Sequence, residues 1–458
     1  MQENRKENIM GTQPIGRLLP TMAFPIMLSM IVQALYNVVD SIFVSMVSEN
    51  ALTSVSLVFP VQNLIIAVSV GTAVGINALL SRRLGEKNYE AANKVANNGV
   101  SVTVLTWLVF AAVGALFSTT FMSLCGAEGQ VAADGALYMR IVTIFSLGAL
   151  VEITMERILQ VTGKTVYQMI SQMSGAVVNI ILDPIMIFGL LGFPAMGVAG
   201  AAVATVTGQL FAMVVSLLLN HFKNHEVRLS AKGMLHLEGR TIRGIYQVGL
   251  PSIIMQSIGS VMTFGMNKIL IVFSQTAVSV FGVYFKLQSF VFMPVFGVTN
   301  ALVPIVGYNY GARQKKRIID AVKLALVMAL AIMAAGLAVF QLLPVQLLGL
   351  FSASENMLEI GVPALRIISL CFPLAGVGVV LSCVFQALGD GMLSLWMSAV
   401  RQLLLLLPAA WVLARLGGLH TVWFAFIFAE GFGFLLALAF YRHIYRTKIS
   451  RLEEIKFD

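Results

Sequence analysis

Charged side chains are scarce in this sequence. Asp, Glu, Lys and Arg make up 11% of the 458 residues, whereas soluble proteins carry about 25%. Hydrophobic residues make up 58% and the mean hydropathy is +0.88. They occur in runs of the length, about 20 residues, that a helix needs to cross a bilayer. This shortage of charge excludes a soluble enzyme and a disordered chain, and it indicates a polytopic α-helical membrane protein.

Cysteine and enzyme motifs are lacking as well. Cys125, Cys371 and Cys383 are an odd number and two of them share one apolar run, which argues against a disulfide framework or a metal cluster. There is no P-loop, and no Ser or Cys nucleophile with His and Asp partners is evident. The first sixteen residues lack the apolar centre of a signal peptide. We therefore expect no enzyme activity and no cofactor.

The apolar runs predict twelve membrane-spanning helices, and the basic residues orient them. Most of the 30 Lys and Arg residues follow the even-numbered spans or flank the termini. Because basic loops stay in the cytoplasm, both termini are predicted to lie there, and the net charge of +9 is an orientation signal rather than a nucleic-acid-binding surface. The expected spans are 18–46, 51–81, 96–120, 133–156, 165–191, 197–222, 244–273, 277–306, 320–345, 360–387, 391–415 and 420–441. The basic segments are 5–17, 82–94, 157–164, 223–243, 313–323 and 442–456.

The second half of the sequence repeats the first. One constant offset in residue number places Pro25 on Pro251 and Gly163 on Gly389, and near the fifth span a slightly shorter offset places Pro184 on Pro408. Six spans are an even number, so both halves share one orientation, as in transporters whose substrate site lies between repeats. We predict an N-terminal lobe at 1–222, a cytoplasmic linker at 223–243 and a C-terminal lobe at 244–458.

Six segments, spread over nearly the whole chain, resemble the multidrug and toxic compound extrusion (MATE) transporters. They are PIMLSMIVQALYNVVDSIFVS in the first span, SRRLGEKNYEAA after the second, LQVTGKT after the fourth, NIILDPIMIFG in the fifth, GVAGAAVAT in the sixth and YNYGARQKKR after the eighth. Each is weak alone, but together in this order they are specific. The resemblance implies two six-helix bundles in a V shape and efflux driven by H⁺ or Na⁺.

Two aspartates favour one branch of that family. The DinF-like branch keeps an aspartate in the first span and another in the fifth, which match Asp40 in LYNVVDS and Asp183 in NIILDP. The NorM-like branch instead keeps acidic residues in the seventh and tenth helices, and those spans contain none here. The resemblance therefore favours a DinF-like transporter with ion coupling in its first half.

Four oxygen-bearing side chains are predicted at one depth in the first half: Asp40, Asn179, Asp183 and Thr205. Helix geometry places them roughly 9–18 Å below the outer surface. Carboxylates within a bilayer are costly and usually functional, and Na⁺ takes several oxygen ligands. We therefore predict an H⁺ or Na⁺ coupling site here, although hydrogen bonds to a neighbouring helix alone would also explain the residues.

Further acids and prolines accompany this site. Glu152 could relay protons from the cytoplasm, and Glu156, a turn nearer the surface, could do so too or form a solvated salt bridge with Arg157. Pro184 leaves the carbonyl of Ile180 without its helical partner. We expect hinges at Pro25 and Pro184, with the first span bending when the ion binds.

The second half carries the opposite charge. Lys268, Lys286 and Arg401 lie within spans, against one acid, Glu430. We hypothesise that Arg401 pairs with Glu430. Lys286 could bind an anionic or zwitterionic substrate, act as countercharge to an aspartate, or extend to the membrane surface.

The remaining substrate-binding candidates are apolar, aromatic or amide side chains. With 24 Met and 29 Phe the chain can form a soft surface that adapts to varied ligands, although each candidate could equally face lipid or a helix core. The candidates are Gln33, Tyr36, Gln62, Met255, Gln256, Tyr284, Gln288, Phe292 and Met293.

Together with the resemblance, these features predict a cation-coupled antiporter in a prokaryotic plasma (inner) membrane, and the resemblance implies a monomer. It would export amphiphilic organic molecules, including drugs, by alternating access. The alternatives are a flippase for lipid-linked oligosaccharides, an exporter of anionic or zwitterionic metabolites, and a membrane-embedded enzyme or receptor.

Overall fold

The computed structural model describes residues 8–351 and 353–452, so parts of the predicted basic segments 5–17 and 442–456 lie outside the described residues. The described residues form helices and no strand. This follows from the composition, because a lipid environment offers backbone groups no hydrogen-bond partners and a helix satisfies them internally. The all-α membrane fold is therefore confirmed.

The helices follow the predicted spans closely. In the first half they are α1 (Ile9–Thr12), α2 (Ile15–Val47), α3 (Glu49–Gly85), α4 (Tyr89–Leu124), α5 (Gly129–Ile144), α6 (Leu147–Val161), α7 (Thr165–Phe188) and α8 (Val198–Lys223). In the second half they are α9 (Ala231–Leu235), α10 (Gly239–Leu270), α11 (Gln275–Gly311), α12 (Lys315–Leu342), α13 (Pro344–Gly349), α14 (Glu355–Ser369), α15 (Phe372–Ala387), α16 (Gly391–Ala399), the π-helix η1 (Val400–Leu406), α17 (Leu407–Gly417), α18 (Leu419–Val422), α19 (Phe424–Ile444) and the π-helix η2 (Tyr445–Ile449).

One predicted span is broken. Within the described residues, eleven spans are long and apolar enough to cross a membrane, and twelve if α14 and α15 count as one. These two helices meet at an angle of 51°, inside the span expected at 360–387. Pro373 lies in the first turn of α15, where its missing N–H prevents α14 from continuing.

The internal repeat is visible in the backbone. Ser48 and Ser274, which are related by the same offset as Pro25 and Pro251, each accept a hydrogen bond from the backbone N–H three residues later, at 3.0 Å in both. Lys87 and Arg313, also related by this offset, adopt left-handed φ angles of 55° and 57°, which are uncommon outside glycine. The two halves therefore share caps and turns as well as spans.

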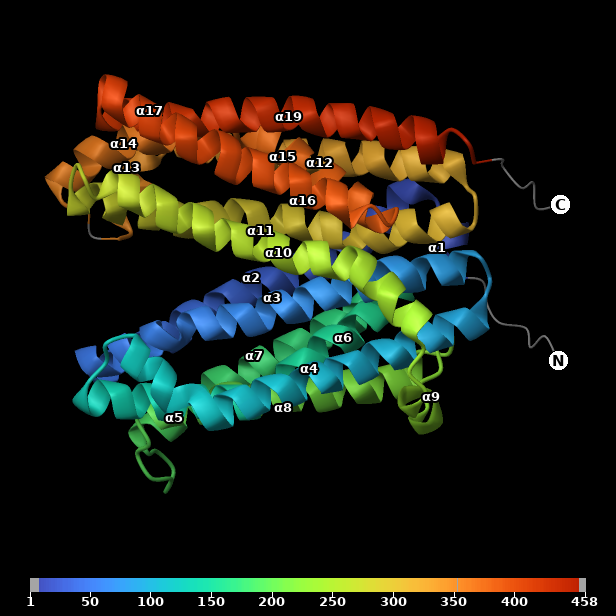
Figure 1. Cartoon of the computed structure of the whole chain (residues 1–458), viewed down its shortest axis with the longest axis horizontal. Helices are drawn as coiled ribbons and strands as arrows, with labels where there is room; N and C mark the ends of the chain where they lie inside the picture. Colours follow the sequence, from blue (N-terminus) through green and yellow to red (C-terminus); the bar gives the residue numbers. More distant parts are fainter. Residues whose placement is uncertain (1–7, 352, 453–458) are drawn as a thin grey trace. The chain divides into compact units, whose positions relative to one another are not determined.

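Packing divides the chain into two units. Unit 1 comprises Leu28–Gly249 with the residues up to Ile9, and unit 2 comprises Met10–Met27 with the residues from Leu250 onward. Helices α2 and α10, visible in Figure 1, therefore each contribute to both units. The predicted lobes follow the sequence repeat and differ from this division at both helices.

A close helix crossing positions the candidate site in unit 1. Helices α7 and α8 pack against each other, and a Cβ placed on Gly208 would lie 2.8 Å from the carbonyl oxygen of Gly175 and 3.1 Å from Cβ of Asn179. Because no side chain fits there, the backbones approach closely. This approach brings Asn179 and Thr205 together.

Candidate functional site

The carboxyl groups of Asp40 on α2 and Asp183 on α7 hydrogen bond to each other. Asp183 has an exposed fraction of 0%. A hydrogen bond between two carboxyl groups requires a proton on one of them. Among the described residues, Oδ1 of each aspartate has no hydrogen-bond partner. The pair can therefore hold a proton and still offer free oxygen ligands.

Asn179 and Thr205 complete this group. In one amide orientation Asn179 Nδ2 donates to Thr205 Oγ1 at 3.4 Å. In the other orientation Asn179 donates to Asp183 Oδ2 at 3.2 Å and accepts from the backbone N–H of Thr205 at 3.1 Å. The second orientation is preferred because it satisfies both ends of a buried amide. The four side chains predicted to share one depth are thus brought together.

A chain of amides and a phenol extends from the aspartate pair. Gln33 hydrogen bonds to Tyr36, whose phenol is close enough to Asp40, Asp183 and Glu152 to interact with their charges. Gln172 on α7 donates to Oε1 of Gln33.

Sequence reasoning missed Gln168 and Gln172. Both lie on the face of α7 that also carries Asn179 and Asp183, since side chains three or four residues apart share a helix face. The spacing of these four residues along α7 is the signal in the sequence from which Gln168 and Gln172 could have been found.

The two glutamates of α6 lie inside unit 1. Glu156 has an exposed fraction of 6%, so the alternative of a solvated salt bridge with Arg157 is wrong for this side chain. The Arg157 guanidinium instead donates to Oε1 of Gln160 at 3.0 Å. Glu152, half-buried, lies one turn from Glu156 on the same face.

Basic residues surround the end of α6 beyond the span. Burial lowers the pKa of Lys164, and the carboxylate of Glu226 opposes that change. The Lys164 ammonium donates to the carbonyl of Lys223. This end of unit 1 is therefore the basic, cytoplasmic side.

In unit 2 the predicted pair of Arg401 and Glu430 is confirmed. Nη1 of Arg401 lies 3.1 Å from both carboxylate oxygens of Glu430, and each side chain is 17% exposed. Arg401 belongs to the π-helix η1, a form frequent at functional sites.

Two lysines of unit 2 remain exposed. Nζ of Lys286 lies 5.8 Å from the ring centre of Phe351, and Nζ of Lys268 lies 5.5 Å from that of Phe264. Both contacts are within the range of a cation–π interaction.

The other predicted substrate residues are dispersed. Gln62 donates to the hydroxyl of Tyr138 at 3.1 Å, and Tyr284 is 3% exposed beside Phe281 and Phe426. Phe292 packs against Phe372 with ring centres 5.7 Å apart. Met255, Gln288 and Met293 are half-buried, and Gln256 is exposed.

The predicted hinge residues lie within helices. Pro25 is buried in α2, two residues before that helix passes from unit 2 to unit 1, and Pro184 follows Asp183 in α7.

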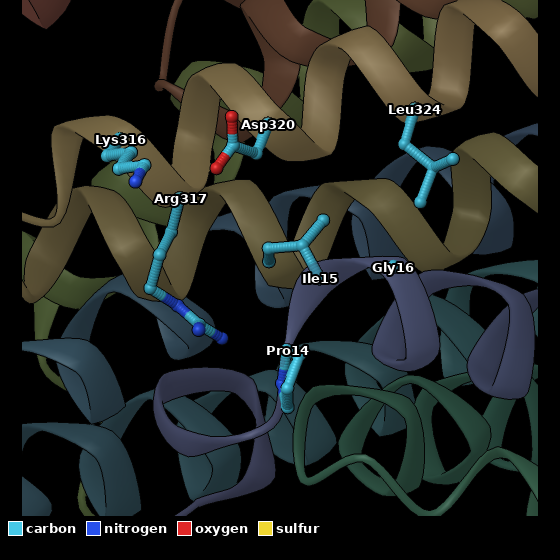
Figure 2. A pocket seen from close by; sticks show the side chains of 7 residues that line it. All are labelled: Pro14, Ile15, Gly16, Lys316, Arg317, Asp320 and Leu324. Atoms are coloured by element: carbon cyan, nitrogen blue, oxygen red, sulfur yellow. The ribbon is translucent and has the colours of Figure 1, made fainter.

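A surface pocket of about 510 Å³ opens in unit 2 where α2 begins. Pro14, Ile15 and Gly16 line it together with Lys316, Arg317, Asp320 and Leu324 of α12 (Figure 2). The Arg317 guanidinium donates to the carbonyls of Met10 and Gln13 at 2.6 and 2.8 Å. The role of Arg317 is therefore to hold the segment that precedes α2.

The residues of the aspartate site fit H⁺ or Na⁺. Among the described residues no group of three or more His, Cys, Asp or Glu side chains gathers as a metal cluster. Two carboxyl groups with a neighbouring amide and hydroxyl are hard oxygen ligands, which suit a hard cation.

Comparison with known proteins gives consistent results. The MatE family model matches residues 25–185 and 251–412, two stretches that begin at the related residues Pro25 and Pro251. The multidrug export protein MepA of Staphylococcus haemolyticus (strain JCSC1435) is 24% identical over 409 residues, 89% of each chain. MepA of Staphylococcus aureus (strain MSSA476) is 24% identical over 428 residues, 93% of each chain.

Solved structures agree over almost the whole length. A multidrug resistance MATE family transporter of the MOP superfamily, in an outward-facing conformation, has a TM-score of 0.90 at 26% identity, covering 98% of this chain and 99% of that one. A MOP superfamily transporter from Pyrococcus furiosus, described as having a binding pocket of reverse polarity that suggests a different function, also has a TM-score of 0.90, at 25% identity and the same coverage.

Because the proteins that it matches are transporters, this protein is a transporter and not an enzyme. Its many spans and its bacterial relatives are consistent with the plasma membrane. The family model covers well over half of the chain, once in each half. This chain belongs to the MatE family of membrane transporters.

Proposed function

We propose that this transporter exports amphiphilic organic compounds in exchange for H⁺, with Na⁺ as the second choice, and that Asp40 and Asp183 bind the coupling ion as in the DinF-like branch. The observation that carries this proposal is the contact between two carboxyl groups from different helices, each with a buried oxygen that makes no bond to the described residues. Multidrug export is the activity for which the MepA proteins are named.

The coupling follows from the charge of the pair. Two carboxylates in contact repel each other when both are ionised, and a shared proton removes that repulsion. Proton loss therefore pushes α2 away from α7, and proton gain draws them together. Pro25 lacks the N–H that would stiffen α2, so we propose that α2 bends there and reshapes the interior of unit 1.

H⁺ is favoured over Na⁺ because two carboxyl groups from different helices meet, and a shared proton removes the repulsion between them. Among similar solved structures, one MATE is described as straight and one as bent, with TM-scores of 0.89 each at 25% identity, and a bend in α2 would produce a difference of this kind.

A second candidate is export of anionic or zwitterionic compounds. The exposed ammonium group of Lys286 in unit 2 favours it, and the Pyrococcus furiosus transporter described as having reverse pocket polarity is a precedent. No observation favours the lipid-linked oligosaccharide flippase.

The test is ethidium efflux from cells that express wild type or Asp183→Asn at matched levels, with and without a protonophore and Na⁺. We expect efflux that the protonophore abolishes and that Asp183→Asn lacks. Asp134→Asn is the matched control, because Asp134 lies at the start of α5, where it accepts a hydrogen bond from Gln130 at 2.7 Å. Loss on removing Na⁺ alone would make the same pair a sodium site, and normal efflux by Asp183→Asn would refute the coupling assignment.

A further inference from the structure

Helices α3 and α6 meet at buried polar groups. Three side chains here carry a polar atom that bonds to none of residues 8–351 and 353–452, and their exposed fractions are 2, 6 and 0% in chain order. Asn77 Nδ2 donates to Gln160 Oε1 at 2.7 Å, which joins the two helices. We call this set the α3–α6 seam: Asn77, Glu156 and Gln160.

Such a concentration needs a physical reason. A buried polar atom without a partner costs about 1–3 kcal/mol, and more than about 90% of such groups in proteins are bonded. Buried polar atoms of this kind are the ones that bind internal water, which needs two to four polar partners. The seam offers amide and carboxyl groups from two facing helices.

The repeat shows that the acidic residues of this crossing are not a requirement of helix packing. At the offset that relates Pro25 to Pro251, Asn77 becomes Val303 on α11, which is 4% exposed. Glu152 and Glu156 become Gly378 and Ser382 on α15, which packs against α11, and Gln160 becomes Gln386. The crossing in unit 2 thus has no counterpart of the two glutamates, which occur only in the repeat that holds the aspartate pair.

The seam leads from the aspartate pair toward the basic side of unit 1. Tyr36 is close enough to Asp40, Asp183 and Glu152 to interact with their charges. Glu152 interacts in the same way with Glu156. Glu152, Glu156 and Gln160 follow one face of α6 at intervals of four residues and cover about 12 Å. At the far end Arg157 bonds to Gln160.

We propose that the α3–α6 seam is the route by which the proton leaves Asp40 and Asp183 for the cytoplasm, with Glu152 and Glu156 as proton-relay residues. This inference rests on the proposed H⁺ coupling. An exporter driven by inward proton flow must release each proton on the cytoplasmic side, and the aspartate pair lies toward the outer half of its spans.

The relay moves one proton and no electrons. The O–H bond of the aspartate pair breaks, and its proton passes through water to the carboxylate of Glu152, where a new O–H bond forms. That proton moves in the same way to Glu156 and then to water beside Arg157. Each carboxylate returns to its ionised state, so the relay is ready for the next cycle.

The first test follows protons in liposomes that contain the full-length protein and a pH-sensitive dye. Ethidium transport by wild type should drive a proton flux, and Glu152→Gln and Glu156→Gln should each slow that flux about a hundredfold, the lower end of what a positioned proton-transfer group contributes. Equilibrium binding of ethidium should stay within about twofold of wild type, because these residues act after binding.

Two controls separate a relay from a structural role. Glu156→Asp keeps a carboxyl group and should restore part of the flux. Glu90→Gln removes an exposed glutamate of α4 that pairs with Lys94 at 3.0 Å and should leave the flux unchanged. If wild type moves no protons, the proposed function and the relay both fail. If wild type moves protons and Glu152→Gln and Glu156→Gln move them equally fast, only the relay is wrong.

The second test measures hydration and does not depend on transport. In a chain with the three native cysteines replaced by alanine, Asn77→Cys is compared with Val303→Cys, its counterpart in unit 2. A small water-borne thiol reagent applied from the cytoplasmic side should modify Asn77→Cys and leave Val303→Cys unmodified. Equal reactivity of the two thiols, or no reaction of Asn77→Cys, would overturn the hydrated route.

Discussion

Arg401 and Glu430 form the ion pair of unit 2 near the positions that Asn179 and Thr205 occupy in unit 1. At the offset that places Pro184 on Pro408, Arg401 falls two positions before the counterpart of Asn179, and Glu430 falls next to that of Thr205. A fixed pair with each charge 17% exposed neutralises itself and has no need of an external ion. At the level of single residues, unit 2 therefore holds a fixed ion pair near the positions where unit 1 holds Asn179 and Thr205.

We expect Glu430→Gln to lower the thermal stability of the purified protein, because it leaves the Arg401 charge without its counterion. Removing one partner of a buried pair costs about 3–5 kcal/mol, whereas replacing both by apolar residues is often neutral. The melting temperature in detergent should therefore fall for Glu430→Gln and recover in the double variant Arg401→Met with Glu430→Met. A single variant that melts like wild type would show that the pair contributes nothing.

The residues of the candidate site were predictable to different degrees. Asp40 and Asp183 stand out because a carboxylate inside an apolar run is rare, and helix geometry then gives their common depth. Gln168 and Gln172 were missed because amides are common on polar faces and carry no charge that would mark them. That the carboxyl groups of Asp40 and Asp183 meet depends on how α2 packs on α7, which one sequence does not contain.

Among the helices, α4 has a clear second task, because it holds the linker between the repeats. Asn97 accepts from the backbone N–H of Ser230 at 2.9 Å and donates to the carbonyl of Arg228 at 3.1 Å. Asn98 accepts from the N–H of Glu238 at 2.8 Å. Figure 1 shows the short helix α9 at this end of unit 1. The linker is thus fixed by side chains that bind its backbone.

We expect Asn97→Ala to release the linker without disturbing the spans. The variant loses its hydrogen bonds to Ser230 and Arg228 at about 1 kcal/mol each, so the linker should open roughly thirtyfold more often. Limited trypsin digestion at Lys232 should accelerate by about the same factor when opening precedes cleavage. Asn356→Ala, on the exposed start of α14, is the control and should digest like wild type; unchanged cleavage of Asn97→Ala would mean that other contacts hold the linker.

The elements themselves were largely predictable from the sequence. All twelve predicted spans have helical counterparts, because runs of about 20 apolar residues are strong signals. The break between α14 and α15 was not predicted, since the whole segment is apolar and its hydropathy hides the bend at Pro373. Helices α1 and α9 are only 4 and 5 residues long, and their position depends on side chains distant in sequence.

Over the whole molecule, the spans of the two units carry different charged side chains. Unit 1 offers Asp40 and Asp183, whereas unit 2 offers the exposed ammonium of Lys286. This difference would allow the protein to bind a substrate that carries both charges, or to distinguish cationic from anionic substrates.

We therefore expect Lys286→Ala to reduce transport of an anionic test dye at least tenfold, which is about 1.4 kcal/mol, and to spare ethidium. Uptake of both dyes into inverted vesicles at matched expression measures the ratio. Lys268→Ala is the matched control, as another exposed lysine of unit 2 over a phenylalanine ring. Equal loss of both dyes in Lys286→Ala would show that Lys286 does not select by charge.

The assignment of Met10–Met27 to unit 2 has a consequence for how the protein is made. The Arg317 guanidinium that binds the carbonyl of Met10 is 307 residues further along the chain. At roughly 5–20 residues per second, the ribosome needs on the order of 15–60 s to synthesise that stretch. During this interval the start of α2 waits in the membrane without its final neighbours. Insertion and assembly are therefore separate events for this helix, and a gene divided at the linker would yield two fragments, neither of which carries a complete unit.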